Sequence, residues 1–175
     1  MPGNSFIKFS DVDIGESMQE GHDGTKGWIE FGEWSWDIES ETSFLKGGGA
    51  AVGKPTPGTF SFSHYFDVSS TVLLTKIVSG THFKEVRIHM LKQTGDAGGK
   101  PQTFFEIVMT DAFVTKVATK AAEDGSLEQD VEMVCKEISL GYKAQLNDGA
   151  LEKSAIPFDW NIAKMNQKPT VTSSF

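Results

Sequence analysis

A glycine-rich segment at residues 48–54 is the part of the chain closest to a known chemical motif. It matches the first seven positions of a phosphate-binding loop, in which backbone N–H groups hold phosphates and a lysine reaches them. A Ser or Thr and then a helix should follow, but the chain continues with Pro55 and Pro57. We therefore interpret the segment as a Gly-rich arm that reaches a neighbouring molecule.

The other reactive side chains do not form a recognisable metal or nucleophile set. The one cysteine, Cys135, alternates in step with Val131 and Met133, which predicts a small core residue. The histidines are not spaced as a metal-binding pair, so we expect them at the solvent or at an interface. They are His22, His64, His82 and His89.

Carboxylates are abundant, and three of them project from one face of a predicted strand: Glu128, Asp130 and Glu132. Glycosidase acid–base pairs face each other across a cleft, whereas a stripe along a strand is typical of a solvated face. No nucleophile-elbow motif of the serine hydrolases is present. We expect no enzymatic activity, no cofactor and no bound metal.

Composition limits the class of protein further. The 175 residues are 38% hydrophobic and carry a formal net charge of −8, which predicts one folded acidic domain and argues against nucleic-acid or membrane binding. A single cysteine excludes an intrachain disulfide. We find neither a membrane-spanning apolar run nor a cleaved secretory signal, so we expect synthesis in the cytoplasm and any export without such a signal.

The elements that must position these residues follow a period of two. We expect about eight or nine mostly antiparallel strands, with a β-bulge at Gly32 inside one long strand, residues 28–38. The other strands are predicted near residues 6–9, 60–62, 86–90, 104–110, 112–117, 131–135, 138–146 and 156–162.

Helical spacing interrupts this period once, at residues 69–80. Asp67 or Ser69 can cap the start of that helix, and Gly80 can end it in a left-handed conformation. The predicted fold is an all-β barrel with one exterior α-helix, spanning residues 1–166 as a single domain. Residues 39–58 lack a periodic pattern and form the extended arm, and residues 167–175 are a polar tail expected to be disordered.

Two tryptophans, Trp34 and Trp36, share one face of the long strand and are expected in the core. The residues that alternate with them should give a polar outward surface: Glu33, Ser35 and Asp37. An open sheet with such a surface must protect its edges, and assembly into a closed ring is one solution.

From residue 6 to residue 166 the chain resembles the Hcp family, the haemolysin-coregulated tube proteins of the type VI secretion system. The order and spacing of several segments carry the resemblance: Phe6-Ile-Lys-Phe-Ser-Asp-Val12, Gly15-Glu-Ser17, Trp34-Ser-Trp36, Gly47-Gly-Gly-Ala-Ala-Val-Gly-Lys54, Phe60-Ser-Phe-Ser-His-Tyr-Phe-Asp67, Ser79-Gly-Thr-His-Phe83 and Phe158-Asp-Trp-Asn-Ile162.

The resemblance implies a ring-forming β-barrel without catalytic activity. Six copies would form a ring with a central channel, rings would stack into a tube, and a contracting sheath would expel the tube with a spike protein, VgrG, at its tip. Effector proteins would travel in the channel, so the tube would be secreted outside the cell or into target cells. The expected partners are therefore further copies of the chain, the spike, effectors and the sheath, with no nucleic acid and no membrane.

Two sets of residues receive roles in this interpretation. The outward set, Glu33, Ser35 and Asp37, would line the channel. The arm would join stacked rings through Gly47, Gly48, Gly49, Ala50, Ala51, Val52, Gly53 and Lys54. Two other readings remain open: a monomeric barrel that binds a small apolar molecule inside, and, with least support, a hydrolase with carboxylate catalysis.

Overall fold

The computed structural model describes residues 4–45, 49–95 and 98–175. Within them the chain forms twelve strands, one short 3₁₀ helix and one α-helix. In chain order these are β1 (Ser5–Phe9), β2 (Met18–Gln19), β3 (His22–Asp23), η1 (Gly24–Lys26), β4 (Trp28–Glu30), β5 (Trp34–Ser35), β6 (Ile38–Leu45), β7 (Gly49–Pro57), β8 (Phe60–Tyr65), α1 (Val68–Ser79), β9 (Phe83–Gln93), β10 (Pro101–Ala121), β11 (Leu127–Tyr142) and β12 (Ile156–Asn161).

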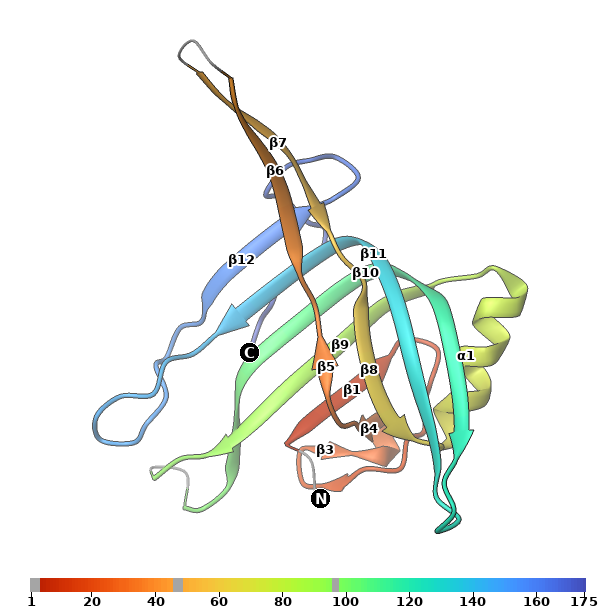
Figure 1. Ribbon diagram of the computed structural model, residues 1–175. Helices are drawn as coiled ribbons and strands as arrows, with labels where there is room; N and C mark the ends of the chain where they lie inside the picture. Colours follow the sequence, from red (N-terminus) through yellow and green to blue (C-terminus); the bar gives the residue numbers. More distant parts are fainter. Residues whose placement is uncertain (1–3, 46–48, 96–97) are drawn as a thin grey trace.

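Eight of these strands form one sheet in the order β4-β1-β9-β10-β11-β8-β5, with β12 beside β11. Every pair in it is antiparallel. The sheet is strongly curled, with α1 on its outside (Figure 1). The predicted all-β fold of mostly antiparallel strands with one exterior helix is confirmed.

The two end strands of the sheet, β4 and β5, follow one another in sequence and are linked by residues 31–33. The Phe31 N–H donates to the Ser5 carbonyl of β1 at 3.1 Å, and the Gly32 N–H donates to the Ser63 carbonyl of β8 at 2.7 Å. The predicted bulge in one long strand is therefore wrong, because the strand ends before Gly32 and a new one begins after it. The alternation changes there because the chain leaves β1 and joins β8.

Inward-facing apolar side chains fill the concave side of the sheet. Phe60 and Phe62 of β8 are 1% and 3% exposed, because they alternate with serines that face outward. Burying a side chain of this size stabilises the fold by about 1.5–3 kcal/mol. The other fully buried large apolar side chains come from six elements: Ile7, Phe9, Ile29, Leu73, Phe83, Ile88, Ile107, Met109, Met133 and Ile138.

Strands β10 and β11 are each continuous where the sequence predicts two strands. The inward side chains of β10 change parity between Met109 and Ala112, and those of β11 change between Met133 and Ile138. These changes lie opposite one another in the pairing. Asp111, between them on β10, has a φ of 52°. β10 and β11 are therefore kinked at the same place. In the sequence, the change of inward parity at this kink looks the same as the end of one strand and the start of another.

Helix α1 begins and ends where the sequence predicts. The Asp67 carboxylate accepts the Ser69 N–H at 2.8 Å, and the Ser70 hydroxyl accepts the Asp67 N–H at 3.0 Å, which forms a capping box. Gly80 ends the helix with a φ of 67°. Leu73, which is fully buried, anchors the helix to the core.

Residues 167–175, expected to be disordered, instead lie against the outer face of the sheet. Backbone N–H groups of the tail donate to side chains of β10 and β11: Thr170 to Glu137 at 2.6 Å, Ser173 to Ser139 at 2.8 Å and Ser174 to Glu106 at 2.9 Å. Every residue except proline has a backbone N–H group, so a contact made by these groups does not depend on which side chains the tail carries. The amino-acid composition of the tail therefore could not reveal this contact.

Candidate assembly surfaces

The alternation expected around the two central tryptophans is present. Trp34 and Trp36 pack against the core, with the Trp34 ring centroid 5.6 Å from that of Phe60. The residues that alternate with them are exposed: Glu33, Ser35 and Asp37. β5 pairs with β8, so Ser35 lies beside Ser61. The outward polar surface that the sequence suggests is therefore in place, and its role as a channel lining stays a prediction.

This outward polar surface continues across β8, β11 and β10. The three carboxylates predicted to share one face of a strand lie opposite two lysines of β10. The ion pairs are Glu128–Lys120 at 3.3 Å, Asp130–Lys120 at 4.0 Å and Glu132–Lys116 at 3.6 Å. Exposed pairs of this kind add about 0–1 kcal/mol each. Their main effect is to keep a carboxylate-rich surface hydrophilic with part of its charge paired.

The predicted arm, residues 39–58, is not a patternless loop but a β-hairpin of β6 and β7, which projects away from the sheet (Figure 1). Gly47 and Gly48 lie outside the described residues. The remaining arm residues fall on β7: Gly49, Ala50, Ala51, Val52, Gly53 and Lys54. These residues pair with β6 as an extended strand. They therefore do not form the curved loop followed by a helix that a phosphate-binding motif requires.

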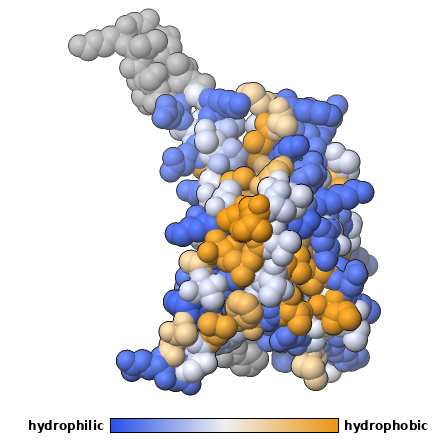
Figure 2. Space-filling model, turned by 90° about the vertical axis from the view of Figure 1, so that its right-hand side faces the viewer, coloured by the Kyte–Doolittle hydropathy of each residue, from blue (hydrophilic) through white to orange (hydrophobic). Residues whose placement is uncertain are grey.

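Helix α1 presents apolar side chains to solvent. Val68, Leu74 and Val78 are 46%, 38% and 83% exposed. Figure 2 views the side of the molecule that carries α1 and shows hydrophobic side chains in the middle of that side, among polar ones. A surface of this kind suits contact with another protein chain.

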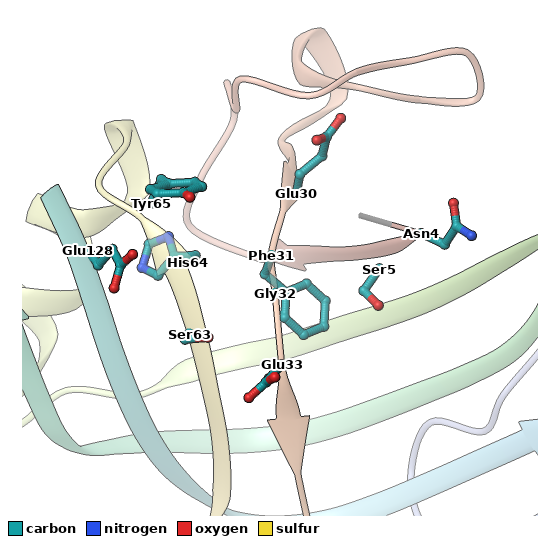
Figure 3. Close-up of a pocket in the computed structure, with 10 residues that line it drawn as sticks. All are labelled: Asn4, Ser5, Glu30, Phe31, Gly32, Glu33, Ser63, His64, Tyr65 and Glu128. Atoms are coloured by element: carbon teal, nitrogen blue, oxygen red, sulfur yellow. The ribbon is translucent and has the colours of Figure 1, made fainter. Parts of the chain in front are cut away.

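A pocket of about 510 Å³ opens where the two ends of the sheet meet (Figure 3). Residues of β8 and β11 line one side of the pocket, and residues at the start of β1 line the other side. Residues 30–33 lie between the two sides. The lining residues are Asn4, Ser5, Glu30, Phe31, Gly32, Glu33, Ser63, His64, Tyr65 and Glu128. No motif marks this pocket in the sequence, because it forms only when the sheet curls.

The expectation that the histidines face solvent or an interface is wrong for two of them. His22 is 8% exposed and His64 is 5% exposed. His64 lies between Gln129, at 2.9 Å, and Asp67, at 3.4 Å, beneath the start of α1. Polar partners on other elements allow these rings to be buried, and such partners are distant in the sequence.

A buried polar chain connects β3, β9 and β10. His22 Nε2 lies 2.7 Å from His89 Nδ1, and His89 Nε2 lies 2.5 Å from Glu106, which also accepts from Arg87 at 3.1 Å. Burial, with the nearby His89, lowers the pKa of His22 to about 4. Burial alone would raise the pKa of Glu106, but hydrogen bonds from His89 and the Ser174 N–H lower it to about 2.

Glu106 interrupts an apolar run between Phe105 and Ile107, and that interruption is the one sequence signal that could have revealed the buried chain. Cys135 packs against the core as expected, and burial, followed by the charge of Glu137, raises the pKa of its thiol to about 12. Its thiolate form, which reacts, is therefore disfavoured.

Two features of the described residues bear on broader classes of function. They contain no group of three or more His, Cys, Asp or Glu side chains placed to hold a metal ion. None of their helices is long and apolar enough to cross a membrane.

The chain resembles known proteins in both sequence and fold. It is 30% identical over 165 residues to protein hcp1 of Pseudomonas aeruginosa, covering 93% of this chain and 96% of that protein. A solved structure of a type six secretion system protein matches 94% of this chain and 98% of its own, with a TM-score of 0.82 and 23% identity. The crystal structure of Hcp1 from Salmonella typhimurium matches 94% and 97%, with a TM-score of 0.71 and 24% identity.

A family model decides what these similarities mean. The model described as type VI secretion system effector, Hcp, matches residues 6–145, which include the central tryptophans, the arm and most of the curled sheet. The chain therefore belongs to the Hcp family of type VI secretion system proteins.

Proposed function

We propose that this chain is a structural tube component of the type VI secretion system, which assembles as hexameric rings that stack. In this proposal the polar surface around Ser35 lines the channel of the ring, and the β6–β7 arm joins one ring to the next. The protein acts by assembly and by carrying effector proteins in the channel, without catalysing a reaction.

The observation that supports the proposal most strongly is that this small domain has three surfaces that differ in polarity and shape. A broad outward surface is polar and partly charge-paired, the helix side is apolar, and a hairpin projects from the remainder. A ring of identical subunits needs an apolar lateral contact, a hydrophilic channel and a contact between layers. Family membership supports assigning the three surfaces to those three needs.

The partners follow from the same proposal. The tube would contact the spike protein VgrG at its tip, effector proteins inside and sheath proteins outside. The chain would be made in the cytoplasm and leave it with the tube, to the extracellular space or a target cell. A hydrophilic channel suits folded cargo that must be released afterwards, because it offers little apolar area for tight binding.

The mass of the purified protein in solution tests this proposal. Six chains of 19.1 kDa should give a particle near 115 kDa by mass photometry or light scattering. Electron microscopy of the same sample should show six-fold rings with an open centre. A monomer at micromolar concentration would refute the proposal and favour a small barrel that acts alone.

A further inference from the structure

The pocket where the two ends of the sheet meet is rich in carboxylates and has no lysine or arginine in its lining. Three carboxylates line it: Glu30, Glu33 and Glu128. Glu128 pairs with Lys120, whereas Glu30 and Glu33 form no ion pair with any residue that the structure describes. Both are exposed. The pocket therefore offers two carboxylates to a cation that comes from outside the subunit.

The walls of the pocket suit a particular kind of cation. Phe31 and Tyr65 supply aromatic surface, and Tyr65 is 65% exposed at the rim (Figure 3). Ser5 is only 8% exposed, and it lines the pocket and adds a hydroxyl to it. Aromatic walls, a hydroxyl and carboxylates together fit a lysine side chain, which has an apolar stem and a charged head.

The arm and the pocket lie at opposite ends of the same two strands. β5 starts beside the pocket and leads at its other end into β6, and β8 starts after β7 and ends at Tyr65 in the pocket. Figure 1 shows the arm projecting from one end of the molecule, away from β4 and the end of β8. Two copies placed head to tail would therefore bring the arm of one toward the pocket of the other.

The arm carries a cation that could reach such a pocket. Lys54 lies on β7 and is exposed. Lys54 lies three residues before Pro57, which pairs with Ile38 at the base of the arm, so at about 3.3 Å per residue it stands about 10 Å out from that base.

We propose that the pocket at the sheet closure receives the arm of a second copy of this chain, with Lys54 facing Glu30 and Glu33. This inference rests on the proposed function, since it assigns the receptor for the stacking arm. The contact is heterologous, because each subunit contributes its arm at one end and its pocket at the other. The same contact can therefore be repeated from ring to ring, which builds a tube.

Charge reversal tests the pairing. We expect Lys54→Glu and Glu30→Lys each to weaken ring–ring association about tenfold, because six contacts each weakened about 1.5-fold multiply to that factor. The double variant should recover association toward the original protein. Glu152→Lys, an exposed reversal outside the pocket, is the matched control and should have no effect. Tube length by electron microscopy and sedimentation of ring stacks measure the association.

Cysteine trapping gives a second measurement that also detects brief stacking. A Glu30→Cys, Lys54→Cys double variant should form disulfides on mild oxidation, and the linked species should be heavier than one ring. Lys164→Cys in place of Glu30→Cys is the control, because Lys164 is exposed but does not line the pocket. The native thiol of Cys135 should interfere little, since its pKa is about 12.

The outcomes separate this inference from the proposed function. Rings of about 115 kDa with trapping and charge-swap rescue support both. Intact rings that neither form the disulfide nor respond to Glu30→Lys overturn the pocket assignment and leave the ring proposal standing. A double charge swap that associates no better than the weaker single variant also overturns the assignment. Absence of any ring overturns both.

Discussion

Replacing Glu106 by glutamine measures how much one buried carboxylate stabilises the fold. Glu106 is 1% exposed and accepts hydrogen bonds from Arg87, His89 and the Ser174 N–H. Glutamine has nearly the same volume, but it loses the charge and replaces an acceptor oxygen with an NH₂ donor. In Glu106→Gln a donor would face other donors, which leaves buried polar groups unpaired.

The expected size follows from the pKa of Glu106, which is about 2 compared with an ordinary value of 4.5. That difference corresponds to about 3 kcal/mol of folding stability from the ionised group. Because the folded-state pKa is the lower one, this stability is present above pH 4.5 and is lost as the pH falls from 4.5 toward about 2. Near pH 3.5, about half of this stability should already be lost.

Urea unfolding at a fixed protein concentration, near pH 7 and near pH 3.5, checks both numbers. We expect Glu106→Gln to cost about 3 kcal/mol near pH 7 and about half of that near pH 3.5. Glu132→Gln, which removes the exposed partner of Lys116, is the control and should cost less than about 0.5 kcal/mol. An equal cost of Glu106→Gln at both pH values would refute the assignment of this stability to an ionised carboxylate.

Three further changes to the chain and one measurement on the unchanged protein test other parts of the structure. In Gly141→Ala the new Cβ would lie 2.3 Å from the Ser173 hydroxyl, so hydrogen exchange of the tail amides should speed up, whereas a chain ending at residue 166 should tolerate the change. Ser35→Trp should reduce effector recovery from purified rings without lowering the melting temperature; equal recovery counts against a channel role. Deletion of residues 47–54 should leave rings intact but weaken stacking, and loss of the rings would contradict the arm assignment. The Cys135 thiol should alkylate slowly in the folded protein and quickly in urea, because burial raises its pKa to about 12; equal rates would contradict its burial.

Local patterns in the sequence predicted the elements that depend on local physics. Helix α1 was found because capping, apolar spacing and the terminal glycine all lie within its own residues. The alternation of Trp34 and Trp36 with polar residues likewise predicted which side chains turn inward. In both cases the information needed is carried within about a dozen consecutive residues.

Features that depend on distant partners were missed or misread. The arm was read as patternless, but its strands pair with each other, so neither needs a buried apolar face to be extended. The tail and the His22–His89–Glu106 chain join residues that are tens of positions apart through single polar contacts. The closure pocket needs both ends of the sheet to meet, and no local pattern encodes that meeting.

The link between the two ends of the sheet also has a consequence for folding kinetics. β1 pairs with β9, which places Ser5 opposite Met90, so the sheet cannot form without contacts between distant parts of the chain. Sheets dominated by such contacts fold slowly, in about milliseconds to seconds. Until residues 31–33 join β1 to β8, the backbone groups of Ser5 and Ser63 that they pair with are free to pair with another chain. The period before this closure is therefore when a newly made subunit is most at risk of aggregation.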